Sequence, residues 1–80
     1  MGNPKPLTYR DLRKRLKKYG VEERRTGKGS HMIFILPDVP GGNKGPQFPI
    51  PHHNDGHEIK MPLIKVLLRR FNIDPDDFWD

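Results

Sequence analysis

The chain contains no cysteine, which excludes a disulfide framework and any thiolate metal site. Apolar residues make up only 32% of the chain, and no run of about 18 of them is present to form a membrane-spanning helix. The first six residues, Met-Gly-Asn-Pro-Lys-Pro, lack the apolar stretch of a secretory signal peptide. Because small domains without disulfides suit a reducing compartment, these absences predict a soluble cytoplasmic protein that does not contact membranes.

The chain is too short for more than one small domain, with 80 residues and a mass of 9.3 kDa. A domain of this size buries about 60% of its unfolded surface, so a large substrate cavity, a dinucleotide fold and a barrel are all excluded. We expect a flexible N-terminus over residues 1–6 and a single domain over residues 7–80.

Positive charge is concentrated near the N-terminus. Residues 1–28 hold ten Lys or Arg against three Asp or Glu, whereas residues 29–80 hold five against seven. A positive region attracts polyanions such as nucleic acids through counterion release, without reading their sequence. The alternative is a solvated helix face without a partner, and composition alone does not separate the two interpretations.

A first amphipathic helix is predicted to begin after Thr8 and to end at Gly20. Its apolar stripe has spacings of three and four residues and consists of Tyr9, Leu12, Leu16 and Tyr19. We expect these rings to be core residues and not base-stacking groups. The opposite, cationic face supplies candidate phosphate-binding residues, which are Arg10, Arg13, Lys14 and Lys17.

Three strands are expected to follow this helix. Residues 21–26 form the first, and the continuous apolar run of residues 31–36 forms a central strand. Residues 47–51 suit only an edge strand, because Pro49 and Pro51 both lack the N–H group on the same side.

The second helix is predicted to have Pro62 in its first turn and to stop near Asn72. Asp74 and Pro75 then start a short helical turn that buries Phe78 and Trp79. The order α-β-β-β-α predicts an α+β fold in which a three-stranded antiparallel sheet carries two helices on one face. One row of the central strand must then point away from the helices, toward a partner or toward the loop of residues 37–46.

The start of the central strand carries the most specific motif, Gly29-Ser30-His31. Residues 27–34 (Gly-Lys-Gly-Ser-His-Met-Ile-Phe) resemble the Gly-Ser-His segment of HicA-like (YcfA-like) mRNA interferase toxins. Residues 51–53 with 58–59, and the helix of residues 63–73, resemble the later segments of that family. The resemblance covers roughly residues 7–80 in the same order.

The resemblance implies a double-stranded-RNA-binding-like fold, endoribonuclease activity on mRNA, and inhibition by a HicB-like antitoxin. It also implies that His31 is catalytic, and that His53 matches the family's second histidine. Histidine suits metal-independent RNA cleavage because its ordinary pKa lies near neutrality. Without the resemblance, the pattern favours His31 as a partly exposed strand-end imidazole bonded to a carbonyl.

The residues beside His31 are weaker candidates. Lys28, Gly29 and Ser30 suit phosphate binding, although they are also ordinary turn residues. A metal cluster is not expected, although five potential ligands are close in sequence: His52, His53, Asp55, His57 and Glu58. The turn at residues 54–56 prevents the helical spacing that would bring them together. We therefore predict no metal and no cofactor.

A second function fits the same pattern. A non-catalytic module of the double-stranded-RNA-binding type would use the basic helix and the Gly-rich turn to contact RNA shape and phosphates. Both hypotheses predict salt-sensitive RNA binding, so only an assay of cleavage distinguishes them.

Overall fold

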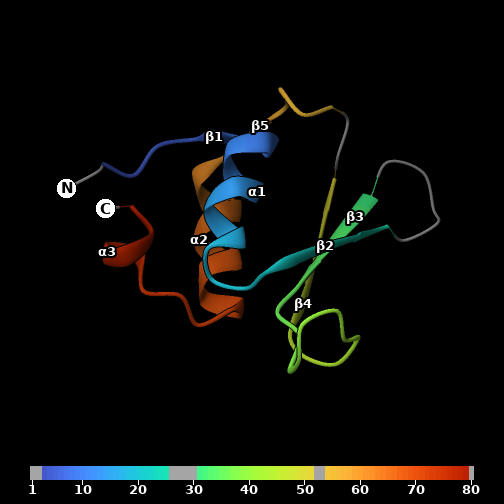
Figure 1. The fold of residues 1–80 in the computed structure, drawn as a ribbon. Helices are drawn as coiled ribbons and strands as arrows, with labels where there is room; N and C mark the ends of the chain where they lie inside the picture. The colour runs from blue at the N-terminus through green and yellow to red at the C-terminus, as the bar shows by residue number, and fades with distance from the viewer. Residues whose placement is uncertain (1–2, 26–30, 52–53, 80) are drawn as a thin grey trace.

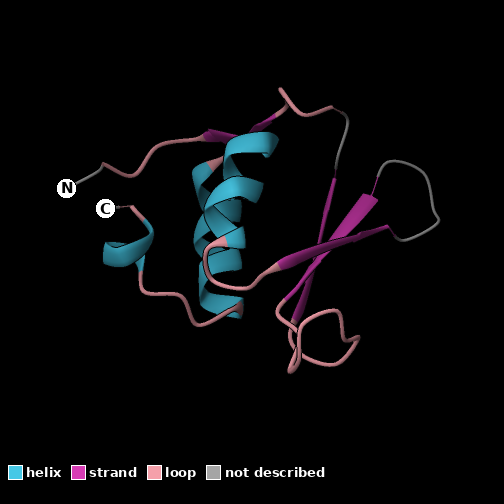
Figure 2. Ribbon diagram, viewed as in Figure 1, coloured by secondary structure: helices cyan, strands magenta, loops and turns pink. Residues whose placement is uncertain are grey.

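The computed structural model describes residues 3–25, 31–51 and 54–79, and has the predicted α+β architecture (Figure 1). In chain order the elements are β1 Leu7–Thr8, α1 Tyr9–Lys17, β2 Glu22–Arg25, β3 His31–Ile35, β4 Gln47–Pro51, β5 Glu58–Ile59, α2 Met61–Arg70 and α3 Pro75–Phe78. Strands β2, β3 and β4 form a three-stranded antiparallel sheet with β3 in the centre. Helices α1 and α2 pack together against one face of it (Figure 2), which confirms the predicted fold.

The edge position of β4 follows from its prolines, as predicted. The Leu36 N–H donates to the Pro46 carbonyl at 3.0 Å, which makes this pair a hydrogen-bonded one. Because such pairs alternate along an antiparallel ladder, Pro49 and Pro51 fall at positions whose N–H would point away from β3. Neither proline removes a bond from the sheet, and both block the pairing of a further strand.

The predicted helix boundaries hold with one change. The Thr8 hydroxyl accepts the Asp11 N–H at 3.2 Å and caps α1. The helix ends at Lys17, before the predicted position, and Gly20 with φ of +85° turns the chain toward β2. Pro62 lies in the first turn of α2, and Asn72 adopts φ of 56° just beyond its end.

The short pair of strands β1 and β5 was not predicted. Leu7 pairs with Ile59 and Thr8 with Glu58. Two residues are too few to show the alternation by which a strand is recognised in a sequence. Together with the bond from the Tyr9 N–H to the His57 carbonyl at 2.8 Å, this pair fixes the start of α1 against the loop before α2.

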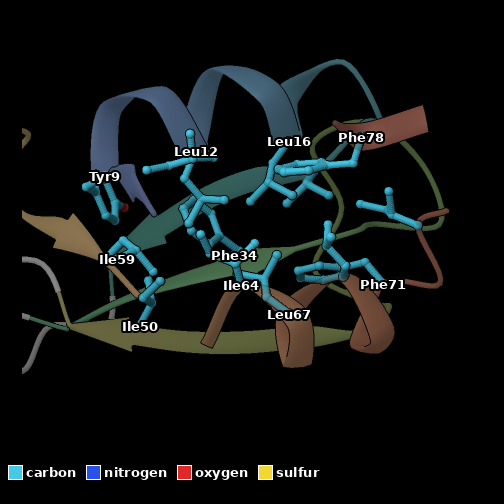
Figure 3. Close-up of a cluster of buried hydrophobic side chains, with 14 of the residues drawn as sticks. Tyr9, Leu12, Leu16, Phe34, Ile50, Ile59, Ile64, Leu67, Phe71 and Phe78 are labelled. Atoms are coloured by element: carbon cyan, nitrogen blue, oxygen red, sulfur yellow. The ribbon is translucent and has the colours of Figure 1, made fainter. Parts of the chain in front are cut away.

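The core lies between the two long helices and the sheet, as Figure 3 shows. The Tyr9 and Phe34 rings stack with centroids 5.6 Å apart, and Phe78 meets Trp79 edge to face at 4.9 Å. The buried cluster consists of Leu7, Tyr9, Leu12, Leu16, Val21, Phe34, Ile50, Ile59, Ile64, Leu67, Leu68, Phe71, Ile73, Phe78 and Trp79. Tyr9, Phe71 and Trp79 are therefore core residues, as predicted, whereas Tyr19 is only partly buried against the cluster.

The face of β3 that points away from the helices is partly covered by the chain's own loop. Phe34 belongs to the helix-side core, so Ile33 and Ile35 point the other way. Ile35 is nevertheless only 2% exposed. The Gly41 N–H donates to Glu22, which is paired with Ile35 across the ladder, at 3.1 Å. The loop of residues 37–46 is thus attached over this end of the outer face, which leaves Ile33 as the part-exposed apolar residue.

Candidate functional site

His31 is the first residue of β3 and is exposed to solvent. It pairs with Pro51 at the end of β4 and belongs to the same outward row as Ile33. His31 therefore lies on the central strand, at the end of the sheet remote from the loop of residues 37–46 (Figure 1). Lys28, Gly29, Ser30 and His53, which were predicted to surround it, lie outside the described residues.

Arg24 lies on β2 opposite Ile33, on the outer face of the sheet, and its guanidinium is engaged by neighbouring groups. It forms an ion pair with Glu22 and donates to the Gly42 carbonyl at 3.3 Å. The hydrogen bond from Arg24, followed by the one from the Gly41 backbone, holds the pKa of Glu22 below its ordinary value. This arrangement fixes the loop of residues 37–46 to β2.

Arg13 lies in a cluster that joins α1, β2 and the loop before β5. Its Nη1 atom is 3.5 Å from Asp55 Oδ1 and 3.7 Å from Glu23 Oε2. The Tyr9 hydroxyl donates to the same Glu23 carboxylate, and burial followed by this bond raises the pKa of Tyr9. Two carboxylates thus balance the charge of Arg13, which links three segments of the chain.

Replacing Arg13 by glutamine is expected to lower the free energy of unfolding by about 1 kcal/mol, because Glu23 and Asp55 lose the cation between them. Urea unfolding followed by circular dichroism measures the change. Arg10→Gln is the matched control, since Arg10 is exposed and forms no ion pair with a described carboxylate. Equal stability of the two variants would show that the cluster contributes nothing.

The remaining predicted phosphate-binding residues of α1 are exposed but lie at different distances from the His31 end. The Arg10 N–H donates to the Asp55 carbonyl at 3.0 Å, in the loop that follows β4. Arg10 is therefore at the same end of the fold as His31, whereas Lys14 and Lys17 lie further along the helix. Because α1 covers the opposite face of the sheet, its cations and the His31 row belong to different layers (Figure 2).

The phosphate-binding candidates chosen from the sequence did not include three further cations. Lys5, Arg15 and Lys18 border the same surface hollow as Lys14, with a volume of about 370 Å³. Lys5 precedes the predicted helix, so its position depends on the β1–β5 pair that the sequence did not reveal. Helical spacing could have found the other two, because Lys14 and Lys18 are four residues apart.

Metal ligands do not gather in the part of the chain that the structure describes: no three of its histidines and carboxylates are close enough to hold an ion. Two of the five residues considered for such a cluster, His52 and His53, lie outside that part. Among the described helices, none is both long enough and apolar enough to cross a bilayer.

The fold and these residues define a small basic α+β domain with an exposed imidazole at the start of its central strand. The family described as "HicA toxin of bacterial toxin-antitoxin" matches residues 9–73. The chain belongs to this HicA toxin family and is a toxin of a toxin–antitoxin system. No curated protein and no solved structure matches the chain.

Proposed function

We propose that this toxin is an endoribonuclease that cleaves mRNA without a metal ion, with His31 as its acid–base residue. The observation that carries the proposal is the exposed position of His31 on the family-matched segment of a rigid central strand. A strand whose other end is buried, through Phe34 and Ile35, holds an imidazole in a defined place while leaving it open to a large substrate.

The chemistry is an internal transfer within RNA. A base removes the proton of the 2′-hydroxyl, the 2′-oxygen forms a bond to phosphorus, and the bond from phosphorus to the 5′-oxygen breaks. An acid protonates the departing 5′-oxygen, which gives a 2′,3′-cyclic phosphate and a free 5′-hydroxyl. Imidazole exchanges protons near neutral pH, so His31 serves in these transfers. Lys28, Ser30, His53 and Arg10 are proposed to hold the substrate, with the Gly29 backbone approaching a phosphate.

The cleavage assay is direct. The purified protein is incubated with RNA in the presence of a chelator, and the 5′ ends of the products are identified. Retained cleavage that leaves 5′-hydroxyl ends agrees with the proposal. RNA that is bound but left intact would identify the protein as a non-catalytic RNA-binding module instead.

The antitoxin partner is proposed to be HicB-like and to cover the outer face of the sheet. His31, the part-exposed Ile33 and the exposed Pro49 lie on this face, so one protein can contact apolar surface and block the imidazole together. Such a partner inhibits by occlusion and not by neutralising cations on the helix layer.

Salt distinguishes the two modes of inhibition. The toxin is co-expressed with the neighbouring small open reading frame, and the complex is purified and titrated at increasing salt. Under apolar occlusion, the affinity is expected to fall less than about tenfold between 0.1 M and 0.5 M salt, because buried contacts are little screened. A steep fall would assign inhibition to charge neutralisation. Separation of the two proteins on a sizing column at micromolar concentration would contradict the partnership.

A further inference from the structure

A cationic hollow lies beside α1, on the side of the helix away from β2. Four basic residues border it, and its volume is about 370 Å³. Its basic residues are Lys5, Lys14, Arg15 and Lys18, and Leu7 and Asp11 complete the lining. With a single carboxylate among its six lining residues, the hollow carries a positive excess.

The lysines of the hollow are open because two of the three acids of residues 1–28 are paired elsewhere, and the third, Asp11, lines the hollow and forms no ion pair with a described residue. Glu22 binds Arg24, and Glu23 binds Arg13. Among the described residues, no carboxylate forms an ion pair with Lys5, Lys14 or Lys18. Lysines at the surface of α1 and its preceding segment therefore carry part of the positive excess seen in the sequence.

The fold holds the walls of the hollow in place. The Arg15 guanidinium donates to the Phe78 carbonyl at 3.0 Å and lies 5.6 Å from the centroid of the Trp79 ring. On the other side, Leu7 is buried and paired with Ile59, so Lys5 is only two residues from a fixed point. A cation cluster fixed at two sides needs little reorganisation to bind an anion.

We propose that this hollow is a second binding site, separate from the His31 site, for the phosphodiester backbone of an RNA strand. Lysine is a compact, hydrated point charge, which suits phosphate contacts that position a nucleic acid without reading bases. A protein partner would need an apolar or aromatic anchor, whereas the apolar lining residue, Leu7, is only 4% exposed. The choice of RNA over DNA rests on the proposed function; the phosphate chemistry does not.

The expected effect follows from counterion release. Each phosphate contact to a single strand contributes about 0.7 to the slope of log affinity against log salt, so at 0.1 M salt each contributes about fivefold in affinity. Removing three lysine contacts should lower the slope by about 2 and the affinity by about 100-fold.

The test uses the full chain and a fluorescent single-stranded 2′-O-methyl RNA, which lacks the attacking hydroxyl and cannot be cleaved by the proposed reaction. Anisotropy titrations between 0.05 M and 0.4 M salt compare the wild type with Lys5→Gln/Lys14→Gln/Lys18→Gln. The matched control is Lys44→Gln/Lys60→Gln/Lys65→Gln, which removes the same charge from exposed lysines that do not line the hollow. A DNA strand of equal length tests whether the sugar contributes. Circular dichroism shows whether each variant remains folded.

The proposal requires that the hollow variant loses both slope and affinity well beyond the control. Equal losses in the two variants, or no RNA binding by the wild type, would overturn it. So would a hollow variant that binds RNA normally but releases a co-purified antitoxin, because the hollow would then be a protein interface. Cleavage is measured separately on unmodified RNA. If the hollow variant loses salt slope but the wild type does not cleave RNA, the proposed enzyme is refuted and this site is not. If the wild type cleaves RNA but the hollow variant keeps the wild-type salt slope, this site is refuted and the enzyme is not.

Discussion

His31→Ala is expected to lower the rate of RNA cleavage by about 10²–10⁴-fold, the usual contribution of one positioned acid–base group. The residue lies at the exposed end of β3, so its removal takes away proton transfer without opening a cavity in the core. The substitution should therefore leave the unfolding midpoint in urea unchanged. Single-turnover cleavage of a labelled RNA at saturating protein measures the chemical step apart from binding.

Two further variants separate catalysis from contact. His31→Gln retains hydrogen bonding but cannot exchange protons near neutral pH, so it should be as inactive as the alanine variant. His57→Gln is the matched histidine control. His57 lies before β5, and its backbone carbonyl, which the substitution retains, accepts the Tyr9 N–H. Full activity in His31→Gln would exclude proton transfer by this residue, and full activity in His31→Ala would place the active site elsewhere.

Binding to uncleavable RNA gives the third readout for His31. We expect His31→Ala to bind the 2′-O-methyl strand within about threefold of the wild type, since the electrostatic affinity comes from contacts of Lys and Arg with phosphates, which the substitution leaves in place. A large loss of binding with no change in the single-turnover rate would make His31 a binding residue. The non-catalytic alternative would then explain the chain better than the enzyme does.

Much of the fold could be predicted because the local signals agree with one another. The spacing of Tyr9, Leu12 and Leu16 gives the packed side of α1, and the structure buries all three completely. The paired prolines of β4 exclude it from the centre of the sheet, and the continuous apolar run of residues 31–36 predicts β3 as the central strand, as the structure shows. Caps at Thr8 and Asp74 set two helix starts to the residue.

The arrangement of the charges could not be predicted in the same way. In the sequence, Arg13 and Lys14 are neighbours on one cationic face. In the structure, Arg13 pairs with Glu23 and Asp55, whereas Lys14 borders the separate hollow. Asp55 is 42 positions away along the chain, and helical periodicity contains no information about such a partner. A charge that meets a distant acid is a structural link, and only the tertiary fold shows which cations remain open.

The position of the loop of residues 37–46 could not be predicted from the sequence either. Its Gly and Pro content predicts irregular structure, which the structure has, but not the attachment of Gly41 and Gly42 to Glu22 and Arg24. Those bonds join backbone groups of the loop to side chains of β2. The apolar outer row is consequently smaller than the sequence suggests, because Ile35 is buried.

Phe34→Ala is expected to lower the free energy of unfolding by about 3–5 kcal/mol. Phe34 is 1% exposed at the centre of β3, and its ring stacks on Tyr9 of α1. The truncation leaves a cavity between the sheet and the helices. Because a small domain without disulfides has only about 3–5 kcal/mol to lose, the variant should be largely unfolded at 25 °C. Urea unfolding monitored by circular dichroism provides the measurement.

Ile33→Ala is the matched control, one residue away on the same strand. Its side chain points to the outer face and is only half-buried, so a loss of about 1 kcal/mol is expected. Stability of Phe34→Ala within about 1 kcal/mol of the wild type would contradict the core that places His31.

The antitoxin provides a second readout, because a partner that binds only the folded toxin stabilises it by about 4 kcal/mol at a thousandfold excess over its dissociation constant. Co-expression should therefore restore soluble Phe34→Ala, whereas Ile33→Ala, altered on the proposed interface itself, should fold alone but bind the partner more weakly.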